Sequence, residues 1–301
     1  MKQKPLILLL ATLIVLLGLA YLTGVFERDA STVDVPDVEI PAEALEQVRI
    51  EAPEHTWALQ RQGTRWLLTE PVQEMTDSAA VARFVRDLGA LELESVASNN
   101  PERYARYGVD STASVVSVSW ADGARRLVVG NQGPDFQSIY VRLDDDPRVY
   151  LTRGRLTVPD DLDRWRDKTI VKLPRASVAS VVIEGPEHAF EVQQGPGGWQ
   201  LVEQNDEAPA DSAAVAQWLG RFAMMRADGF IDDLPAAVVR EIAGYRLVFT
   251  TTAGATETIQ FLKRDDDLAV TNAARNITYR LRTSRLQTYV PDPASLISDG
   301  R

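Results

Sequence analysis

Cysteine is absent from the 301-residue sequence, and histidine occurs only twice. The lack of cysteine excludes a disulfide framework, a thiolate metal site, a cysteine nucleophile and a lipidated N-terminal cysteine. With two histidines and no cysteine, most nucleophile–base pairs cannot be assembled, although paired carboxylates remain available. Basic residues are also few: 32 Lys and Arg stand against 43 Asp and Glu, a net charge of −11. This balance argues against a nucleic-acid partner, whose phosphates need neutralising.

Only one long apolar run is present, and it lies near the N-terminus. Leu6–Phe26 contains no charged residue, and as a helix it reaches about 32 Å, enough to cross a bilayer core. Lys2 and Lys4 precede it, which favours an N-terminus in the cytoplasm and a C-terminal body on the other side. The sequence therefore predicts a cytoplasmic tail over residues 1–5 and a transmembrane signal anchor over residues 6–26.

A cleaved signal peptide is the alternative interpretation of the same segment. Gly18–Ala20 offers the small residues of a cleavage site, but the apolar run continues past it and exceeds a usual signal-peptide core. We therefore expect the span to be retained. Residues 27–45 combine acidic residues with Pro36 and Pro41 and show no sustained periodicity, which predicts an extended tether between the membrane and the first domain.

An internal repeat organises the rest of the chain. The segment Val48–His55 recurs with substitutions as Val181–His188, and Asp77–Ala82 returns unchanged as Asp211–Ala216. A period of about 130 residues is too long for a solenoid unit and indicates a whole duplicated domain. The predicted copies and the C-terminal tail occupy residues 46–173, 174–291 and 292–301.

Strand and helix patterns follow the same order in both copies. Short β-type runs broken by Pro53 and Gly63 open the first copy, and Asp77 or Thr76 can cap the helix that follows. The apolar stripe of this helix is Val81, Phe84, Val85 and Leu88 in copy one, and Val215, Trp218, Leu219 and Phe222 in copy two. Hairpin-linked strands come next in each copy.

The expected strands show no regular βαβ alternation, so the predicted fold class is α+β. In full, we predict an N-terminal transmembrane helix followed by two duplicated domains of mainly antiparallel sheet, each with a packed helix. The expected strands are Val48–Glu51, Thr56–Arg61, Trp66–Leu68, Val115–Trp120, Arg126–Val129, Ile139–Leu143 and Val149–Thr152 in copy one, and Tyr245–Thr250, Thr258–Leu262, Leu268–Thr271 and Ile277–Leu281 in copy two.

Several residues recur at matching positions of the two copies. His55 and His188 are the two histidines, and a paired pH sensor or metal site is one interpretation of their match. Duplication alone also explains the match, and the two lie in different predicted domains. Trp66 and Trp199 suggest ligand-stacking platforms, yet aromatic residues on short amphipathic strands more often belong to the core.

Acidic and glycine-rich segments are explained by structural roles. Asp77 and Asp211 head predicted helices, where a carboxylate caps free N–H groups. Asp144–Asp146 and Asp265–Asp267 lack the spaced oxygens and central glycine of a calcium loop, and we expect solvated turns between strands. Gly130–Pro134 lacks the ending and the following helix of a phosphate-binding loop. No catalytic, cofactor-binding or metal-ligating residue is therefore assigned, and no cofactor is expected.

The motifs of the first copy resemble those of a bacterial family, the domain of unknown function 4340. The second copy lacks two of these features, the Tyr-Gly step and the Gly130–Gly133 turn, so a site built on them is expected once or not at all. The motifs are the Trp-containing strand pair Arg65–Pro71, the helix opening Asp77–Val81, the step Tyr107–Asp110, the glycine-ended strand Leu127–Gly130 and the closing Arg166–Lys168.

The resemblance implies a membrane-anchored envelope protein, because the family's usual pattern includes an N-terminal hydrophobic anchor. Its members are often encoded beside ABC-type transport systems of the kind linked to gliding motility. No catalytic residue is established for the family. We therefore expect a single-pass protein of the bacterial inner membrane with a periplasmic body. It is expected to act as a non-enzymatic accessory or interaction subunit, with an ABC-type transporter permease or auxiliary subunits as partners.

Two other functions stay open at this point. Tandem domains create clefts, so an envelope ligand- or glycan-binding module between the two copies is the first alternative. A carboxylate-dependent hydrolase is the second, and it requires two acidic side chains that face each other across a pocket.

Overall fold

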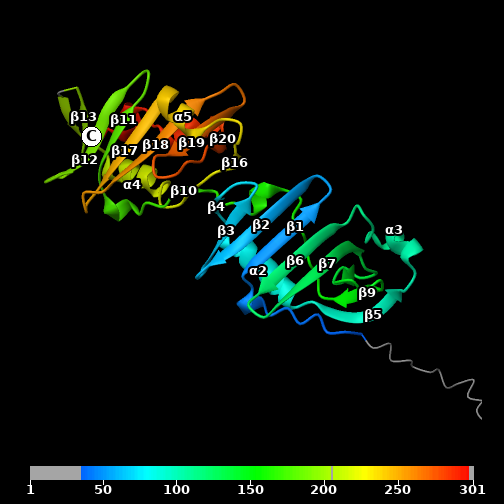
Figure 1. Cartoon of the computed structure of the whole chain (residues 1–301). Coiled ribbons are helices and arrows are strands. Elements are labelled where there is room, and N and C mark those ends of the chain that lie inside the picture. Colours follow the sequence, from blue (N-terminus) through cyan, green and yellow to red (C-terminus); the bar gives the residue numbers. More distant parts are fainter. Residues whose placement is uncertain (1–34, 205, 298–301) are drawn as a thin grey trace, which may run out of the picture. The chain divides into compact units, whose positions relative to one another are not determined.

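The computed structural model describes residues 35–204 and 206–297, and the chain divides into two compact units between Asp160 and Asp161 (Figure 1). Both units consist mainly of antiparallel sheet with a few short helices, so the predicted α+β class is confirmed. In the part of the chain that the structure describes, no helix is long and apolar enough to cross a membrane. The predicted tail 1–5 and span 6–26 lie outside the described residues.

Unit 1, which ends at Asp160, has nine described strands in one antiparallel sheet, in the order β4-β3-β2-β1-β6-β7-β8-β9-β5. Strands consecutive in sequence form hairpins, and β5 extends the sheet by pairing with β9. The strands are β1 (Gln47–Ala52), β2 (His55–Gln62), β3 (Arg65–Glu70), β4 (Glu74–Met75), β5 (Glu92–Ser98), β6 (Ser114–Trp120), β7 (Gly123–Gln132), β8 (Ile139–Leu143) and β9 (Val149–Arg153).

Unit 2, which begins at Asp161, also has nine described strands in its main sheet, ordered β14-β13-β12-β11-β17-β18-β19-β20-β16. Matched in chain order, this is the strand order of unit 1. A separate two-stranded sheet joins β10 (Thr169–Val171) to β15 (Met225–Arg226). The other strands are β11 (Val178–Glu184), β12 (Ala189–Gly195), β13 (Gly198–Glu203), β14 (Asp206–Pro209), β16 (Gly229–Phe230), β17 (Tyr245–Thr251), β18 (Thr256–Lys263), β19 (Asp267–Asn272) and β20 (Tyr279–Arg282).

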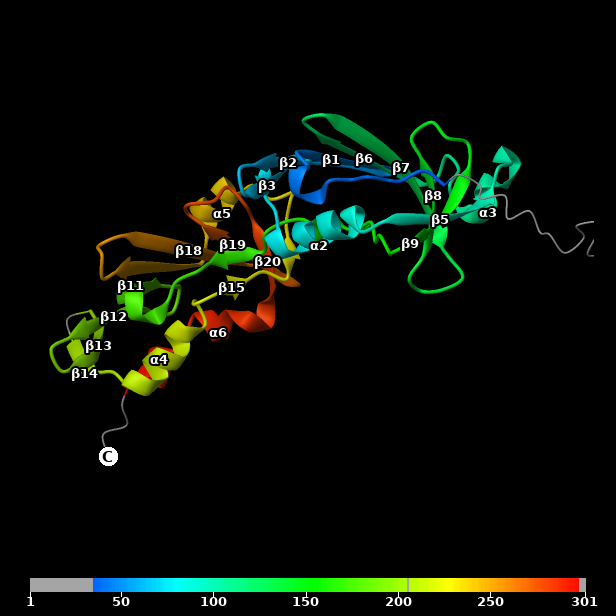
Figure 2. The ribbon, with the colours of Figure 1, turned by 90° about the horizontal axis from the view of Figure 1, so that it is seen from below.

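One amphipathic helix packs on each sheet, α2 (Ser78–Gly89) in unit 1 and α4 (Ser212–Gly220) in unit 2. Figure 2 shows α2 running along one face of the strands β1, β2 and β3. Burial of one apolar stripe holds each helix in place, because apolar residues spaced three or four apart share a helix face. The buried stripe residues are Val81, Phe84 and Leu88 in α2, and Val215, Trp218 and Leu219 in α4, with Phe222 following α4.

A smaller apolar cluster lies on the reverse face of each sheet, beneath a second short helix. In unit 1 it joins Val109, Val128 and Val149 to the tyrosines of α3 (Tyr104–Tyr107). In unit 2 it contains Val239 of α5 (Ala236–Ile242). Val128 belongs to this second cluster because successive strand residues point to opposite faces. The two faces of each sheet are therefore both partly covered, by helices of different length.

The segment predicted as an extended tether over 27–45 is partly packed against unit 1. Val38, Ile40 and Leu45 are buried, and Arg125 donates from Nε to the Val38 carbonyl at 3.1 Å. The prediction of a tether is thus wrong for residues 35–45, because the apolar residues that alternate with acidic ones there pack against unit 1. Residues 27–34 lie outside the described chain.

The unit boundary and the C-terminal tail also differ from the prediction. The boundary between Asp160 and Asp161 precedes the predicted one, between residues 173 and 174, because β10 pairs with β15 inside unit 2. Residues 292–297, the described part of the predicted tail 292–301, pack against unit 2. Leu296 is buried and accepts a hydrogen bond from Asp211 N at 2.8 Å, at the start of α4.

The predicted strands are confirmed within a few residues, and β5 is the long strand that pattern reading missed. Its sequence Glu92–Ser98 alternates acidic and apolar residues only irregularly, and its pairing with β9 shifts register twice. An edge strand with such irregularities lacks the clean alternation that marks a strand in sequence.

Candidate functional site

A tight turn after α3 forms one wall of a pocket in unit 1. Helix α3 ends at Gly108, whose φ of +67° lies in the left-handed region that glycine adopts most easily. Val109 N then donates to the Tyr104 carbonyl at 3.1 Å, which closes the helix end. Asp110 follows and accepts hydrogen bonds from Thr112 N at 3.0 Å and Thr112 Oγ1 at 2.7 Å. The Tyr-Gly-Val-Asp step therefore fixes where α3 stops.

The Gly130 turn packs directly against this step. A Cβ at Gly130 would collide with the Tyr107 carbonyl and with the Val109 side chain, and a Cβ at Gly108 would collide with the Asn131 side chain. Only glycine permits this approach of the two backbone segments. The two sequence motifs that the second copy lacks are thus in contact with each other, and together they hold α3 over the sheet.

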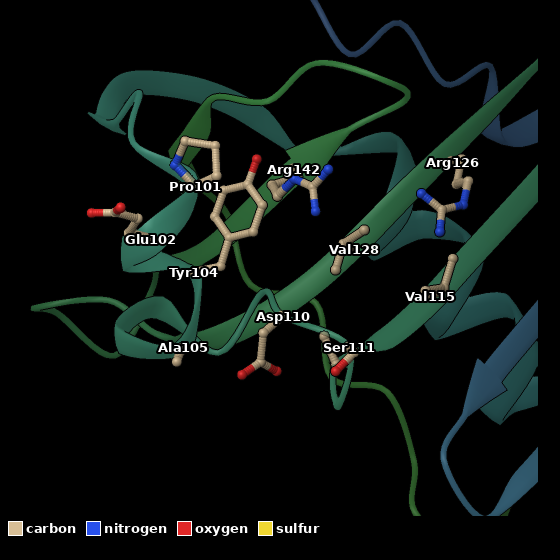
Figure 3. A pocket seen from close by; sticks show the side chains of 11 residues that line it. Pro101, Glu102, Tyr104, Ala105, Asp110, Ser111, Val115, Arg126, Val128 and Arg142 are labelled. Atoms are coloured by element: carbon tan, nitrogen blue, oxygen red, sulfur yellow. The ribbon is translucent and has the colours of Figure 1, made fainter.

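The floor of the pocket is set by strand register. Val115 of β6 pairs with Val128 of β7, which pairs with Arg142 of β8, so these three side chains share one face of the sheet. Arg126 lies two residues before Val128 on β7 and points to the same face. With Tyr104 of α3, these residues border a cavity of about 490 Å³ (Figure 3). This volume suits a small ligand.

Arg142 and Tyr104 form a stacked pair in the pocket. The guanidinium carbon of Arg142 lies 4.2 Å from the centroid of the Tyr104 ring. Such a contact is attractive and fixes the orientation of the cation. Arg142 Nε is buried and has no hydrogen-bond partner among the described residues.

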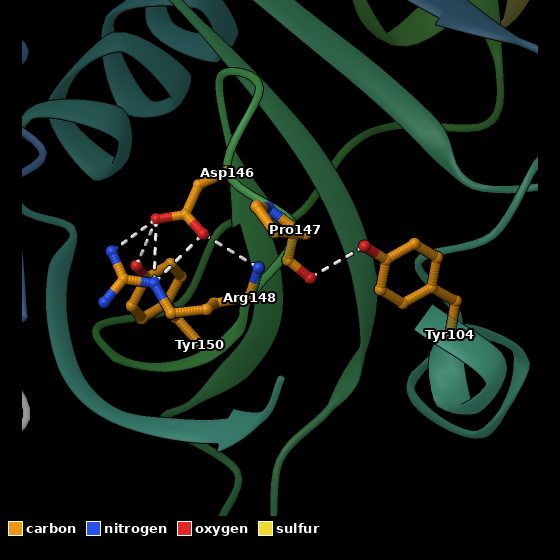
Figure 4. Close-up of polar contacts among 5 residues, drawn as sticks. All are labelled: Tyr104, Asp146, Pro147, Arg148 and Tyr150. Atoms are coloured by element: carbon orange, nitrogen blue, oxygen red, sulfur yellow. Dashed lines mark hydrogen bonds and ion pairs between the residues drawn. The ribbon is translucent and has the colours of Figure 1, made fainter. Parts of the chain in front are cut away.

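The loop between β8 and β9 holds the far side of Tyr104, whose hydroxyl donates to the Pro147 carbonyl at 2.7 Å (Figure 4). In this loop Asp146 accepts hydrogen bonds from Arg148 Nε at 2.9 Å and from the Tyr150 hydroxyl at 2.6 Å. The hydrogen bond from Arg148 lowers the pKa of Asp146, and burial together with Asp146 raises the pKa of Tyr150. This ion pair supports Pro147, and through it the tyrosine.

The geometry suits binding through guanidinium groups. Arg126 and Arg142 carry permanent positive charge, and guanidinium matches carboxylate and phosphoryl oxygens. Across residues 35–204 and 206–297, no group of three or more His, Asp or Glu side chains is placed to hold a metal ion.

Unit 2 does not repeat this pocket chemistry. Strand pairing counted from the repeated Val48 and Val181 places Thr258 and Thr271 at the positions of Arg126 and Arg142. Gln260 takes the position of Val128, and its Nε2 donates to the Arg240 carbonyl of α5 at 2.9 Å. The positions of the two pocket arginines thus carry uncharged side chains in unit 2, whereas the position of Val115 carries Arg246, which lies 3.6 Å from Glu184.

A family model described as "Domain of unknown function (DUF4340)" matches residues 66–241, from β3 in unit 1 to α5 in unit 2. The chain belongs to the DUF4340 family. No curated protein matches the chain. The pocket of unit 1 and the Tyr-Gly step that forms it lie within the matched region.

The Arg-Asp-Lys motif of this DUF4340 protein, Arg166–Lys168, has a structural role in unit 2. The side chain of Arg166 is 1% exposed, and its guanidinium lies 2.9 Å from Asp232 and stacks over the Phe230 ring. Asp167 pairs with Arg275 at 3.1 Å. The motif therefore secures the first segment of unit 2 to the main body of that unit.

The structure places the recurring histidines and tryptophans apart from the pocket. His55 stacks on Trp57 with ring centroids 4.0 Å apart, whereas His188 lies 4.0 Å from Glu203 in the other unit. Trp199 packs against the core of unit 2, and Trp66 is half-buried on β3. None of these residues lines the pocket of Figure 3.

The acidic residues divide into caps and turn residues. Asp77 and Asp211 cap α2 and α4, as predicted. Asp144–Asp146 does lie between two strands, but the expectation of a solvated turn is wrong for Asp146, whose carboxylate is half-buried in an ion pair. Asp267 opens β19 and lies 3.5 Å from Arg264.

Tyr104, Arg126 and Arg142, which define the pocket chemistry, were not singled out by sequence patterns. Two-residue alternation in β7 places Arg126 and Val128 on one face, which is a signal available in the sequence. The position of Arg142 beside them depends on the register between β7 and β8, and that of Tyr104 on the docking of α3. Neither relation is visible before the chain folds.

Proposed function

We propose that this DUF4340 protein is a non-enzymatic, ligand-binding accessory subunit, anchored in the bacterial inner membrane by residues 6–26 with its body in the periplasm. Its partner in this proposal is an ABC-type transport system, as the family resemblance implies. The observation that supports a binding role is the pocket of unit 1, where two arginines and Tyr104 converge over an apolar floor.

The proposal also gives different roles to the two copies of one duplicated module. The shared strand order and the repeated sequence segments support duplication. Unit 1 carries the pocket, while threonines take the positions of its two arginines in unit 2, and we assign ligand binding to unit 1 alone. This replaces a ligand site between the copies with a site inside one of them.

Affinity purification from the native host tests the accessory role. The bait is the full-length chain extracted in detergent, beside the same chain truncated after Phe26, and co-purifying proteins are identified by mass spectrometry. We expect a transporter permease or its auxiliary subunits with the full-length chain and their loss on truncation. Recovery of the bait alone from both preparations would contradict the accessory role.

A pocket variant refines the same experiment. Arg142→Ala removes the stacked guanidinium, and Arg246→Ala is the matched control because Arg246 is an exposed arginine of β17, the strand of unit 2 that corresponds to β6. If ligand binding in unit 1 governs partner association, Arg142→Ala reduces recovery of the partner and Arg246→Ala does not.

A further inference from the structure

We infer that the unit 1 pocket recognises an oxyanion, a phosphoryl or carboxylate group held between Arg126 and Arg142, on a ligand whose apolar part rests on Val115 and Tyr104. This inference rests on the proposed binding role of unit 1 and names the chemistry of its ligand. It follows from three observations: the placement of the two arginines, their lack of a carboxylate partner among the described residues, and the apolar surface beside them.

The two guanidinium groups border one space. Arg126 on β7 and Arg142 on β8 occupy diagonal positions on the same face of the sheet, with Val128 directly opposite Arg142. Figure 3 shows the two side chains on either side of Val128. Diagonal neighbours on adjacent strands lie about 7–8 Å apart at their backbones, within reach of long side chains that share one ligand.

Two nearby arginines, one in β7 and one in the loop between β8 and β9, pair with carboxylates. Arg125 lies 3.7 Å from Asp144, and Arg148 lies 2.6 Å from Asp146. In the described parts of the chain, neither Arg126 nor Arg142 forms an ion pair with a carboxylate, and Arg142 Nε is buried without a hydrogen-bond partner. Guanidinium groups without a carboxylate partner keep N–H donors that an oxyanion in the pocket would accept from.

Two carboxylates lie at the rim but face away from the cations. Figure 3 shows the side chains of Glu102 and Asp110 directed outward, on the opposite side of Tyr104 and Val128 from Arg126. Asp110 is moreover engaged by the backbone and hydroxyl of Thr112. The interior wall of the pocket therefore presents positive charge although the whole chain carries −11.

The cavity is larger than a lone oxyanion. Val115 is half-buried and lines the cavity, and Tyr104 adds an aromatic ring. These groups offer apolar surface next to the two guanidinium groups. The ligand class that fits both features is a small organic molecule with one acidic group and an apolar side, in free form or as the headgroup of an anionic lipid.

Binding of inorganic phosphate and of succinate to the full-length chain in neutral detergent tests the inference, measured by isothermal titration calorimetry. We expect saturable binding at one site for at least one of the two anions. Arg142→Gln and Arg126→Gln should each weaken binding about tenfold, and the control Arg246→Ala should leave it unchanged. Circular dichroism of each variant checks that the fold is intact.

A competition arm separates the two sources of the acidic group. Phosphatidylglycerol added to the micelles competes with the soluble anion if the natural ligand is a lipid headgroup, whereas phosphatidylcholine does not. Absence of competition assigns the site to a soluble ligand.

Two outcomes overturn the inference: no saturable binding of either anion, or binding that folded Arg126 and Arg142 variants retain at full strength. Either result leaves the accessory role standing if the transporter still co-purifies with the full-length chain. Conversely, anion binding without a co-purifying partner supports the pocket chemistry and counts against the accessory role alone.

Discussion

Single residues of one type take different roles in this protein according to the backbone around them. In the Asp144–Asp146 turn, Asp144 adopts a positive φ and accepts a hydrogen bond from Arg126 N, whereas Asp146 is held by Arg148 and Tyr150. The sequence shows only three consecutive carboxylates. The residues differ because the tight turn directs the Asp146 side chain inward and leaves that of Asp145 in solvent.

The substitution Asp146→Asn tests the ion pair that supports the pocket. The hydrogen bonds to Asp146 lower its pKa below the ordinary 3.8, so the carboxylate stabilises the folded state above that pH. The stabilisation is lost as the pH falls from 3.8 toward the folded-state pKa. We expect Asp146→Asn to lower the free energy of unfolding by about 1–2 kcal/mol at pH 7. The difference between the variant and the wild type should shrink below pH 3.8.

Urea denaturation at a series of pH values measures this difference. Asp145→Asn is the control, because Asp145 is exposed in the same turn. A gap between the wild type and Asp146→Asn that is as large at low pH as at pH 7 would show that packing, and not ionisation, is what the substitution disturbs.

At the scale of elements, helices α2 and α4 begin in the same way. Each N-cap aspartate has nearly the same backbone geometry, with φ −67° and ψ 104° at Asp77 and φ −69° and ψ 105° at Asp211. Both carboxylates accept hydrogen bonds from the second and third backbone amides that follow. The repeated sequence at these positions is therefore accounted for by capping.

Removal of either cap should cost a similar amount. Asp77→Ala and Asp211→Ala are each expected to lower the unfolding free energy by about 1 kcal/mol, because two amides lose their acceptor. Asp77→Asn should change it little, since asparagine is an equally good N-cap. Chemical denaturation monitored by circular dichroism provides the measurement, and a neutral effect of both alanine substitutions would refute the capping role.

At the scale of the whole molecule, the two units share a strand order but differ in what covers their reverse faces. In unit 1 the four-residue helix α3 leaves a pocket open beside it. In unit 2 the helix α5 is longer, and its Arg240 carbonyl accepts a hydrogen bond from Gln260 Nε2. A longer helix covers more of the sheet beneath it. The two units thus share one topology, and the cationic pocket belongs to unit 1.

The unit boundary predicts how fragments behave. A fragment of residues 161–301 keeps β10 and the Arg166–Asp232 pair, whereas a fragment of residues 174–301 loses both. We expect the shorter fragment to be less stable by about 3 kcal/mol or more, because the β10–β15 pairing disappears and the buried side chains of Ile170 and Val171 are removed from the core. Thermal unfolding of the two fragments compares them directly, and equal midpoints would place the boundary at residue 174 instead.

Local patterns in the sequence determined much of this architecture. The repeat, the helix caps at Asp77 and Asp211, the buried stripe of α2 and most strands follow from spacing and turn residues, which act between near neighbours in the chain. The α+β class follows from the order of these elements.

Only the tertiary structure decided the pocket and the limits of the units. Arg142 meets Tyr104 because β8 pairs with β7 in one register and α3 docks above them, and Gly130 approaches Tyr107 because two distant turns pack together. The segment before residue 174 belongs to unit 2 for the same reason. Such contacts join residues far apart in the chain, so their geometry exists only once the sheet has formed.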